Sequence, residues 1–195
     1  MSRKQLFILI GALASICLCV VCLAGIGLTY LGKNFSQAIN NAGDPANVQK
    51  VASAIADYTA PEGYKQVAMD LLMYKYVMLI PDINSSASGP FIMLMSFPKN
   101  SSLSQEQMQE QMQRAFSQQS GQQVAMKVVD TQNVTIRGKD AKITILQGQL
   151  KNGGTVRQWL TIFEGKNGPV MLMIQGSTGL SWDEKLAQDF VASIK

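Results

Sequence analysis

The chain has 195 residues, with 17 Lys or Arg, 13 Asp or Glu and no His, and a formal net charge of +4. The absence of His excludes His-dependent catalytic triads and most catalytic zinc sites. The charge is nearly balanced and forms no basic run, which is not the pattern of a nucleic-acid-binding protein. We therefore predict no catalytic residue set, no metal site, no cofactor and no nucleic-acid partner.

The first long feature is Leu6–Leu31, a run of 26 residues without a charge. About 20 apolar residues suffice for a helix to cross a bilayer. Arg3 and Lys4 precede the run, and the positive-inside rule places that end in the cytoplasm. The sequence thus predicts a cytoplasmic n-region over residues 1–5, a single transmembrane helix over 6–31 and an extracytoplasmic domain beyond it, with the cell membrane as a partner.

Two other interpretations of this run are weighed. A cleaved signal peptide normally has an apolar core of about 7–15 residues, so the run is too long, although Ala24, Gly25 and Gly27 leave cleavage open. Lipidation is disfavoured because the chain's three Cys, at positions 17, 19 and 22, each follow a large residue. They are expected to be small apolar residues of the spanning helix, so the rest of the chain has no disulfide.

Residues 32–57 are interpreted as a linker and stalk helix. Asp44 is a suitable N-cap and Pro45 a suitable first residue of a helix that we place at about Pro45–Tyr58. Its apolar positions follow helical spacing: Val48, Val51, Ala52 and Ile55.

Three strands are predicted next, at Tyr64–Asp70, Tyr74–Ile80 and Phe91–Phe97. The third is apolar at successive positions, which indicates a central strand covered on both faces. A Gln-rich helix with a capping box follows at Ser104–Ser120.

The remainder predicts an antiparallel meander and a closing helix. The strands are expected at Val124–Ile136, Ala141–Leu150, Thr155–Glu164 and Pro169–Gln175, with a turn at Arg137–Asp140. Ser181 and Glu184 form a second capping box. The fold class is therefore α+β: residues 58–195 form an antiparallel sheet with helices on both faces, an α/β/α sandwich.

This layout resembles the PsbP-like fold, which includes periplasmic DcrB-like proteins and a eukaryotic Ran-binding relative. The whole chain also resembles small bacterial single-pass membrane proteins. The resemblance to the PsbP-like fold covers about Tyr58–Lys195 and rests on these features: Pro61-Glu62-Gly63-Tyr64, Phe97-Pro98, the capped helix from Ser104, the hairpin VTIRGKDAKITIL, and Phe190, Ser193 and Ile194. It implies a non-enzymatic module that binds or supports another protein.

Several residue groups have the side chains of a functional site, but we assign none of them a role. Ser85, Ser86 and Ser88 with Lys99 have the residue types of a Ser–Lys dyad, but Ser-rich loops are common. A cation could bind to Asp57, Asp70 and Asp82, but each stands at a helix end, a strand end or a loop start, where Asp usually stabilises a turn. The N-x-Ser/Thr sequons at Asn34, Asn84, Asn100 and Asn133 are attributed to composition.

Methionine shows a clearer pattern along the sequence than these residue groups. It recurs on neighbouring apolar strands, and ordinary core filling is the favoured explanation over an adaptable binding surface. The positions are Met73, Met78, Met93, Met95, Met171 and Met173.

The sequence therefore favours a membrane-anchored, non-catalytic accessory or scaffold domain, with an envelope protein as its expected partner. A small-ligand or lipid-binding module is the alternative, with Met and aromatic side chains lining a cavity between sheet and helix. A Ser hydrolase is the third hypothesis and would need one of the loop serines beside a base.

Overall fold

The computed structural model describes residues 42–71, 74–82, 84–85, 88–99, 107, 126–150 and 153–195. Residues 41–195 form one compact unit. The predicted anchor at 6–31 and, apart from Gln107, the predicted helix at 104–120 lie outside the described residues. Within those residues, no helix is long and apolar enough to cross a bilayer.

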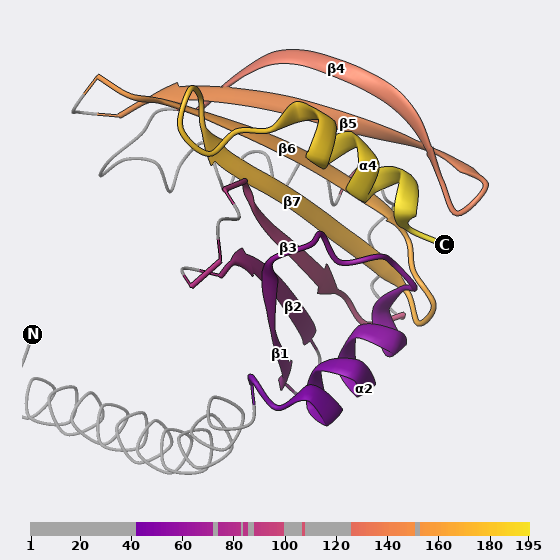
Figure 1. Cartoon of the computed structure of the whole chain (residues 1–195). Helices are drawn as coiled ribbons and strands as arrows, with labels where there is room; N and C mark the ends of the chain where they lie inside the picture. The colour runs from indigo at the N-terminus through magenta and orange to yellow at the C-terminus, as the bar shows by residue number, and fades with distance from the viewer. Residues whose placement is uncertain are drawn as a thin grey trace, which may run out of the picture. The chain divides into compact units, whose positions relative to one another are not determined.

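The core of this unit is a seven-stranded sheet in which every neighbouring pair is antiparallel. Its spatial order is β1-β2-β3-β7-β6-β5-β4, so β1 and β4 are the edges (Figure 1). The bounds are β1 Tyr64–Leu71, β2 Tyr74–Pro81, β3 Phe91–Ser96, β4 Lys127–Ile136, β5 Lys139–Gln149, β6 Thr155–Glu164 and β7 Pro169–Ser177. The α+β prediction and its antiparallel sheet are confirmed.

The central strands bury residues on both faces, as the apolar run predicted. In β7, alternate side chains enter two separate clusters, with Leu172 in one and Met171 in the other. Both side chains are only 1% exposed. Each face of the sheet therefore carries its own apolar core.

The hairpin between β4 and β5 is tighter than predicted. Lys139 already pairs with Ile136, so only Arg137 and Gly138 form the turn. Their φ angles are 55° and 73°, and two successive positive φ values are typical of the type I′ turns that match the twist of a hairpin.

Helix α2, Pro45–Ile55, belongs to the compact unit and is not a stalk. The Asp44 carboxylate caps it by accepting a hydrogen bond from the Asn47 N–H at 3.2 Å. Val51 and Ile55 are 1% and 0% exposed and join the core. The helix begins at Pro45 as predicted but ends at Ile55, three residues before the predicted end, because Ala56 already has extended backbone. The compact unit that contains it begins on the N-terminal side of the domain start predicted at residue 58.

Helix α4, Glu184–Ser193, begins at Asp183, whose carboxylate accepts from the Leu186 N–H at 3.0 Å. The predicted cap, Ser181, instead accepts a hydrogen bond from the Ser177 N–H within the preceding turn. The capping box was therefore placed two residues too early, because Asp183 offers an equally good cap next to the apolar stripe.

Both described helices pack on the same face of the sheet. Residues of α2 and α4 share one cluster, to which α4 contributes Ala187, Phe190 and Val191, and Ile194 follows directly after the helix. Figure 1 shows α2 beside β1–β3 and α4 across β5–β7. A helix on the other face, the two-sided part of the prediction, rests on residues outside the described ranges.

A test of the β4–β5 turn is Gly138→Ala. A side chain at φ 73° costs about 1 kcal/mol, so the free energy of unfolding should fall by about that amount. Gly43→Ala is the control, because nothing lies within 4 Å of a Cβ there. Equal stability of the two variants in chemical denaturation would contradict the assigned turn.

Candidate binding groove

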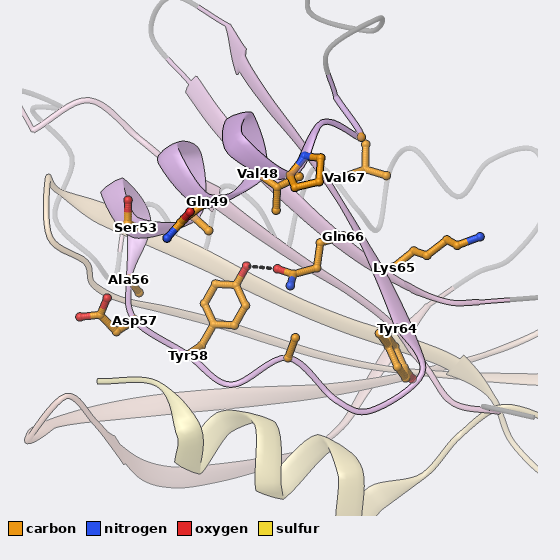
Figure 2. Close-up of a pocket in the computed structure, with 14 residues that line it drawn as sticks. Val48, Gln49, Ser53, Ala56, Asp57, Tyr58, Tyr64, Lys65, Gln66 and Val67 are labelled. Carbon is orange, nitrogen blue, oxygen red and sulfur yellow. Dashed lines mark hydrogen bonds between the residues drawn. The ribbon is translucent and has the colours of Figure 1, made fainter. Parts of the chain in front are cut away.

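An open groove runs between α2 and the outer edge of β1. Its volume is about 770 Å³. The chain between α2 and β1 forms its third side, as Figure 2 shows. Small side chains leave room for the groove: Ala52 of α2 lines it, as do Ala56 and Ala60 of the segment that connects α2 to β1.

The floor and rim of the groove differ in chemistry. Half-buried or buried side chains form the floor: Val48, Ala52, Ala56, Tyr58, Ala60, Tyr64, Gln66 and Val67. Exposed residues form the rim: Gly43, Pro45, Gln49, Ser53, Asp57 and Lys65. A mostly apolar floor with a polar rim is the usual composition of a binding surface.

Tyr58 and Gln66 meet across the groove. The Tyr58 hydroxyl donates to Gln66 Oε1 at 2.7 Å, and Figure 2 shows the two side chains pointing toward each other. The Tyr58 ring also packs against Phe190, with centroids 5.6 Å apart. This contact fixes Tyr58 between the sheet-side core and the groove.

Burial changes the ionisation of the two tyrosines that line the groove. It raises the pKa of Tyr58 to about 12. Burial and, secondly, the negative charge of Asp183 raise the pKa of Tyr64 to about 12. The Tyr64 hydroxyl donates to the Pro90 carbonyl at 2.9 Å. Both phenols are therefore neutral hydrogen-bonding groups at physiological pH.

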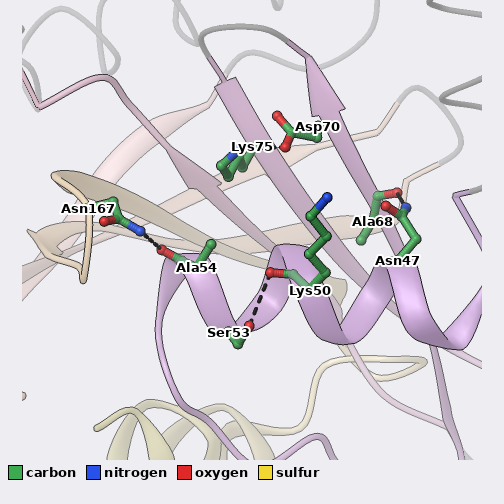
Figure 3. A network of polar contacts seen from close by, with 8 residues as sticks. All are labelled: Asn47, Lys50, Ser53, Ala54, Ala68, Asp70, Lys75 and Asn167. Carbon is green, nitrogen blue, oxygen red and sulfur yellow. Dashed lines mark hydrogen bonds and ion pairs between the residues drawn. The ribbon is translucent and has the colours of Figure 1, made fainter.

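Polar contacts hold the helical wall in place. Asn47 Nδ2 donates to the Ala68 carbonyl at 3.0 Å, and Asn167 Nδ2 donates to the Ala54 carbonyl at 2.8 Å (Figure 3). The first contact ties α2 to β1 and the second ties it to the β6–β7 turn. Because both ends of the helix are fastened, the groove does not depend on apolar packing alone.

Backbone pairing holds the connecting wall. The Lys195 N–H donates to the Asp57 carbonyl at 2.8 Å, and the Asp57 N–H donates to the Lys195 carbonyl at 3.3 Å. The Thr59 N–H donates to the Ser193 hydroxyl at 3.1 Å. The residues at and after the end of α4 therefore support one side of the groove.

The methionines do not line this groove. Met93 and Met95 of β3 stand opposite Met173 and Met171 of β7, and Met78 stands opposite Met93. They form two rows on the face opposite α2 and α4. Core filling fits the burial of Met171. A cavity with Met side chains between sheet and helix stays a prediction, because the helix predicted at 104–120 lies, apart from Gln107, outside the described residues. Met73 lies outside the described residues.

The residues of the Ser–Lys hypothesis are kept apart. Ser85 and Ser88 precede β3, whereas Lys99 follows it, and six extended residues span about 20 Å. The two hydroxyls serve the backbone: Ser85 donates to the Asp82 carbonyl at 2.8 Å and Ser88 to the Leu180 carbonyl at 3.3 Å. Ser86 lies outside the described residues.

The three carboxylates also do not form one site. Asp57, Asp70 and Asp82 pair separately with Lys166, Lys75 and Lys65. Asp70 and Asp82 lie at opposite ends of the β1–β2 hairpin. A backbone hydrogen bond from Asn84 and, after it, the Lys65 side chain lower the pKa of Asp82. Across the described residues, no group of acidic, His or Cys side chains could hold a metal ion.

No family model and no curated protein sequence matches this chain. Among solved structures, the solution structure of cyanobacterial PsbP (CyanoP) from Synechocystis sp. PCC 6803 is similar, with 9% identity and a TM-score of 0.42. The match covers 73% of this chain and 92% of that chain. At this TM-score the likeness supports no argument about function.

The two tyrosines predict how stability depends on alkaline pH. An unfolded tyrosine has a pKa near 10, and that of folded Tyr58 is about 12. Folding therefore favours the neutral phenol. Its contribution to stability is complete below pH 10 and is lost as the pH rises through about 12.

Tyr58→Phe should remove that contribution together with one hydrogen bond, lowering the free energy of unfolding by about 1 kcal/mol at neutral pH. Between pH 10 and 12 the difference between wild type and variant should shrink. Denaturant titrations across this range measure it. A difference that stays constant would contradict the burial of the Tyr58 phenol.

Proposed function

We propose that this chain is a membrane-anchored, non-catalytic accessory domain that binds an envelope protein. The observation that carries the proposal is the groove between α2 and β1, with its apolar floor and polar rim. The uncharged run at 6–31 supports the anchor, and the layout of the sequence supports a PsbP-like, DcrB-like module.

The groove suits a protein partner because its shape is open and its polar groups are spread along the rim. Two rim residues, Asp57 and Lys65, are already paired with Lys166 and Asp82. The rim therefore offers little net charge to a ligand. Recognition would come from apolar contact on the floor and from hydrogen bonds, which is how non-obligate protein interfaces are usually built.

A small apolar ligand or a lipid is the second candidate. The groove volume of about 770 Å³ lies within the range of small-molecule sites. A lipid released from the purified protein and identified by mass would favour it.

The proposed topology is tested by a reporter that is active only outside the cytoplasm, fused after Lys195 through a flexible linker. We expect an active reporter, because Arg3 and Lys4 retain the N-terminus in the cytoplasm. The same fusion without residues 1–31 should be inactive. Activity of a cytoplasm-specific reporter at the same position would overturn the topology.

The accessory role is tested by affinity capture of the tagged full-length chain from mildly solubilised native membranes. Gln49→Trp places a large ring in the groove from an exposed rim position. Lys50→Trp is the matched control, since Lys50 is also exposed and does not line the groove. With wild type and with Lys50→Trp, we expect one partner protein to be captured in a stoichiometric amount. With Gln49→Trp, or with residues 1–41 alone, we expect that protein not to be captured. Equal recovery with both Trp variants would contradict the groove as the binding site.

A further inference from the structure

The methionines are unevenly distributed between the two faces of the sheet. Among the described residues, the cluster on the side of α2 and α4 contains Val, Ile, Leu, Ala, Phe and Trp but no Met. The cluster on the opposite face contains Met95, Met171 and Met173, with Met93 and Met126 packed against it. Both clusters include fully buried Leu and Ile, so core filling alone would place Met on either face. The segregation therefore indicates a use for the thioether groups on this face.

The register of the strands brings three methionines into one row. Met93 of β3 stands opposite Met78 of β2 on one side and Met173 of β7 on the other. These three strands are neighbours in the sheet (Figure 1). Residues that stand opposite each other in antiparallel strands share a face, with Cβ atoms about 4.5–5.5 Å apart. Val67 and Leu160 flank the row, which therefore holds three adjacent thioethers.

The row has a solvent-facing side and a dry side. Met78 and Met93 are half-buried, whereas Met173 is 8% exposed. An ion can therefore enter at the first two sulfur atoms and be shielded from water by the third. Tyr76 and Phe91 pack against the same cluster. Aromatic faces attract cations, which offsets part of the cost of taking an ion out of water.

Three thioethers form a soft ligand set. Soft sulfur ligands select Cu(I), whereas carboxylate and carbonyl oxygens suit Mg, Ca and Mn. Each Met side chain has three rotatable bonds, so the outer two can lean toward Met93 while the strands stay in place. Across the part of the chain that the structure describes, no group of His, Cys or acidic side chains competes as a metal site. The prediction of no metal site rests on those ligand types and does not cover thioethers.

We propose that Met78, Met93 and Met173 form a binding site for a soft monovalent cation, Cu(I), with one thioether sulfur from each of β2, β3 and β7 as ligands. The site lies on the face opposite α2 and α4 and is independent of the groove, the anchor and the partner proposed above. A thioether has no proton to lose. Binding here is therefore constant from about pH 5 to about pH 8, whereas thiolate or imidazole ligands must first be deprotonated.

The test uses the full chain in detergent. Ag(I) serves as a redox-stable probe of the same charge and softness, and Cu(I) is kept reduced with ascorbate. Every sample carries Ala at the three Cys positions, 17, 19 and 22, because thiolates bind the same ions. With isotope-labelled Met methyl groups, NMR should show the signals of Met78, Met93 and Met173 shifting as Ag(I) is added. The signal of Met126 should stay in place.

Met93→Leu and Met126→Leu form the matched pair of variants. Each removes one sulfur and nearly conserves apolar volume, a change that cores tolerate well. Met126 packs on the same cluster but adjoins β4, three strands from β7 in the sheet order. We expect about tenfold weaker Cu(I) binding for Met93→Leu, measured by competition with a chromogenic Cu(I) chelator, and unchanged binding for Met126→Leu. Thermal unfolding without metal reports that both variants keep the fold.

Three results would overturn the site. The first is equal Cu(I) affinity of Met93→Leu, Met126→Leu and the Cys-free chain. The second is a set of Met methyl signals that does not respond to Ag(I). The third is an affinity that rises more than about tenfold from pH 5 to pH 8, because it would assign the ion to ligands that release protons. None of these results bears on the accessory role, which membrane capture decides.

Discussion

The central strands have apolar side chains on both faces, and this constraint organises the rest of the structure. In β3, Ile92 and Leu94 belong to one buried cluster and Met95 to the other. Neither face of such a strand can be left to water, because burying each large apolar side chain is worth about 1.5–3 kcal/mol. On one face, α2 and α4 together cover these apolar side chains. α2 covers the β1–β3 side, and its small residues beside the edge strand leave the groove.

Period-two alternation predicted the sheet well because it reports burial directly. β6 has the predicted bounds, Thr155–Glu164, and Trp159 and Phe163 lie together on one face as the pattern indicated. Helical spacing likewise predicted the start of α2 at Pro45 but not its place in the core. An amphipathic stripe shows that a helix has an apolar face and does not show which surface covers it. The burial of Ile55 against the sheet therefore could not be read from the helix alone.

The groove was harder to predict than the fold. Its floor combines Ala52 of α2, Tyr58 of the connecting segment and Gln66 of β1, and only tertiary packing brings them together. The weak signal available was the recurrence of small residues at positions 52, 56 and 60. Residue type alone did not define a site: Ser85, Ser88 and Lys99, to which no role was assigned, have suitable chemistry, but the length of β3 separates the two serines from Lys99.

One wall of the groove depends on residues that are far apart in the chain. Thr59 and Ser193, which hold it together, are 134 positions apart. A contact of such sequence separation must wait for the intervening chain, and domains emerge from the ribosome N-terminal end first. Residues 56–60 are therefore synthesised long before their support. The groove cannot be complete until α4 has docked, so a nascent or incompletely folded chain should be unable to engage a partner at this site.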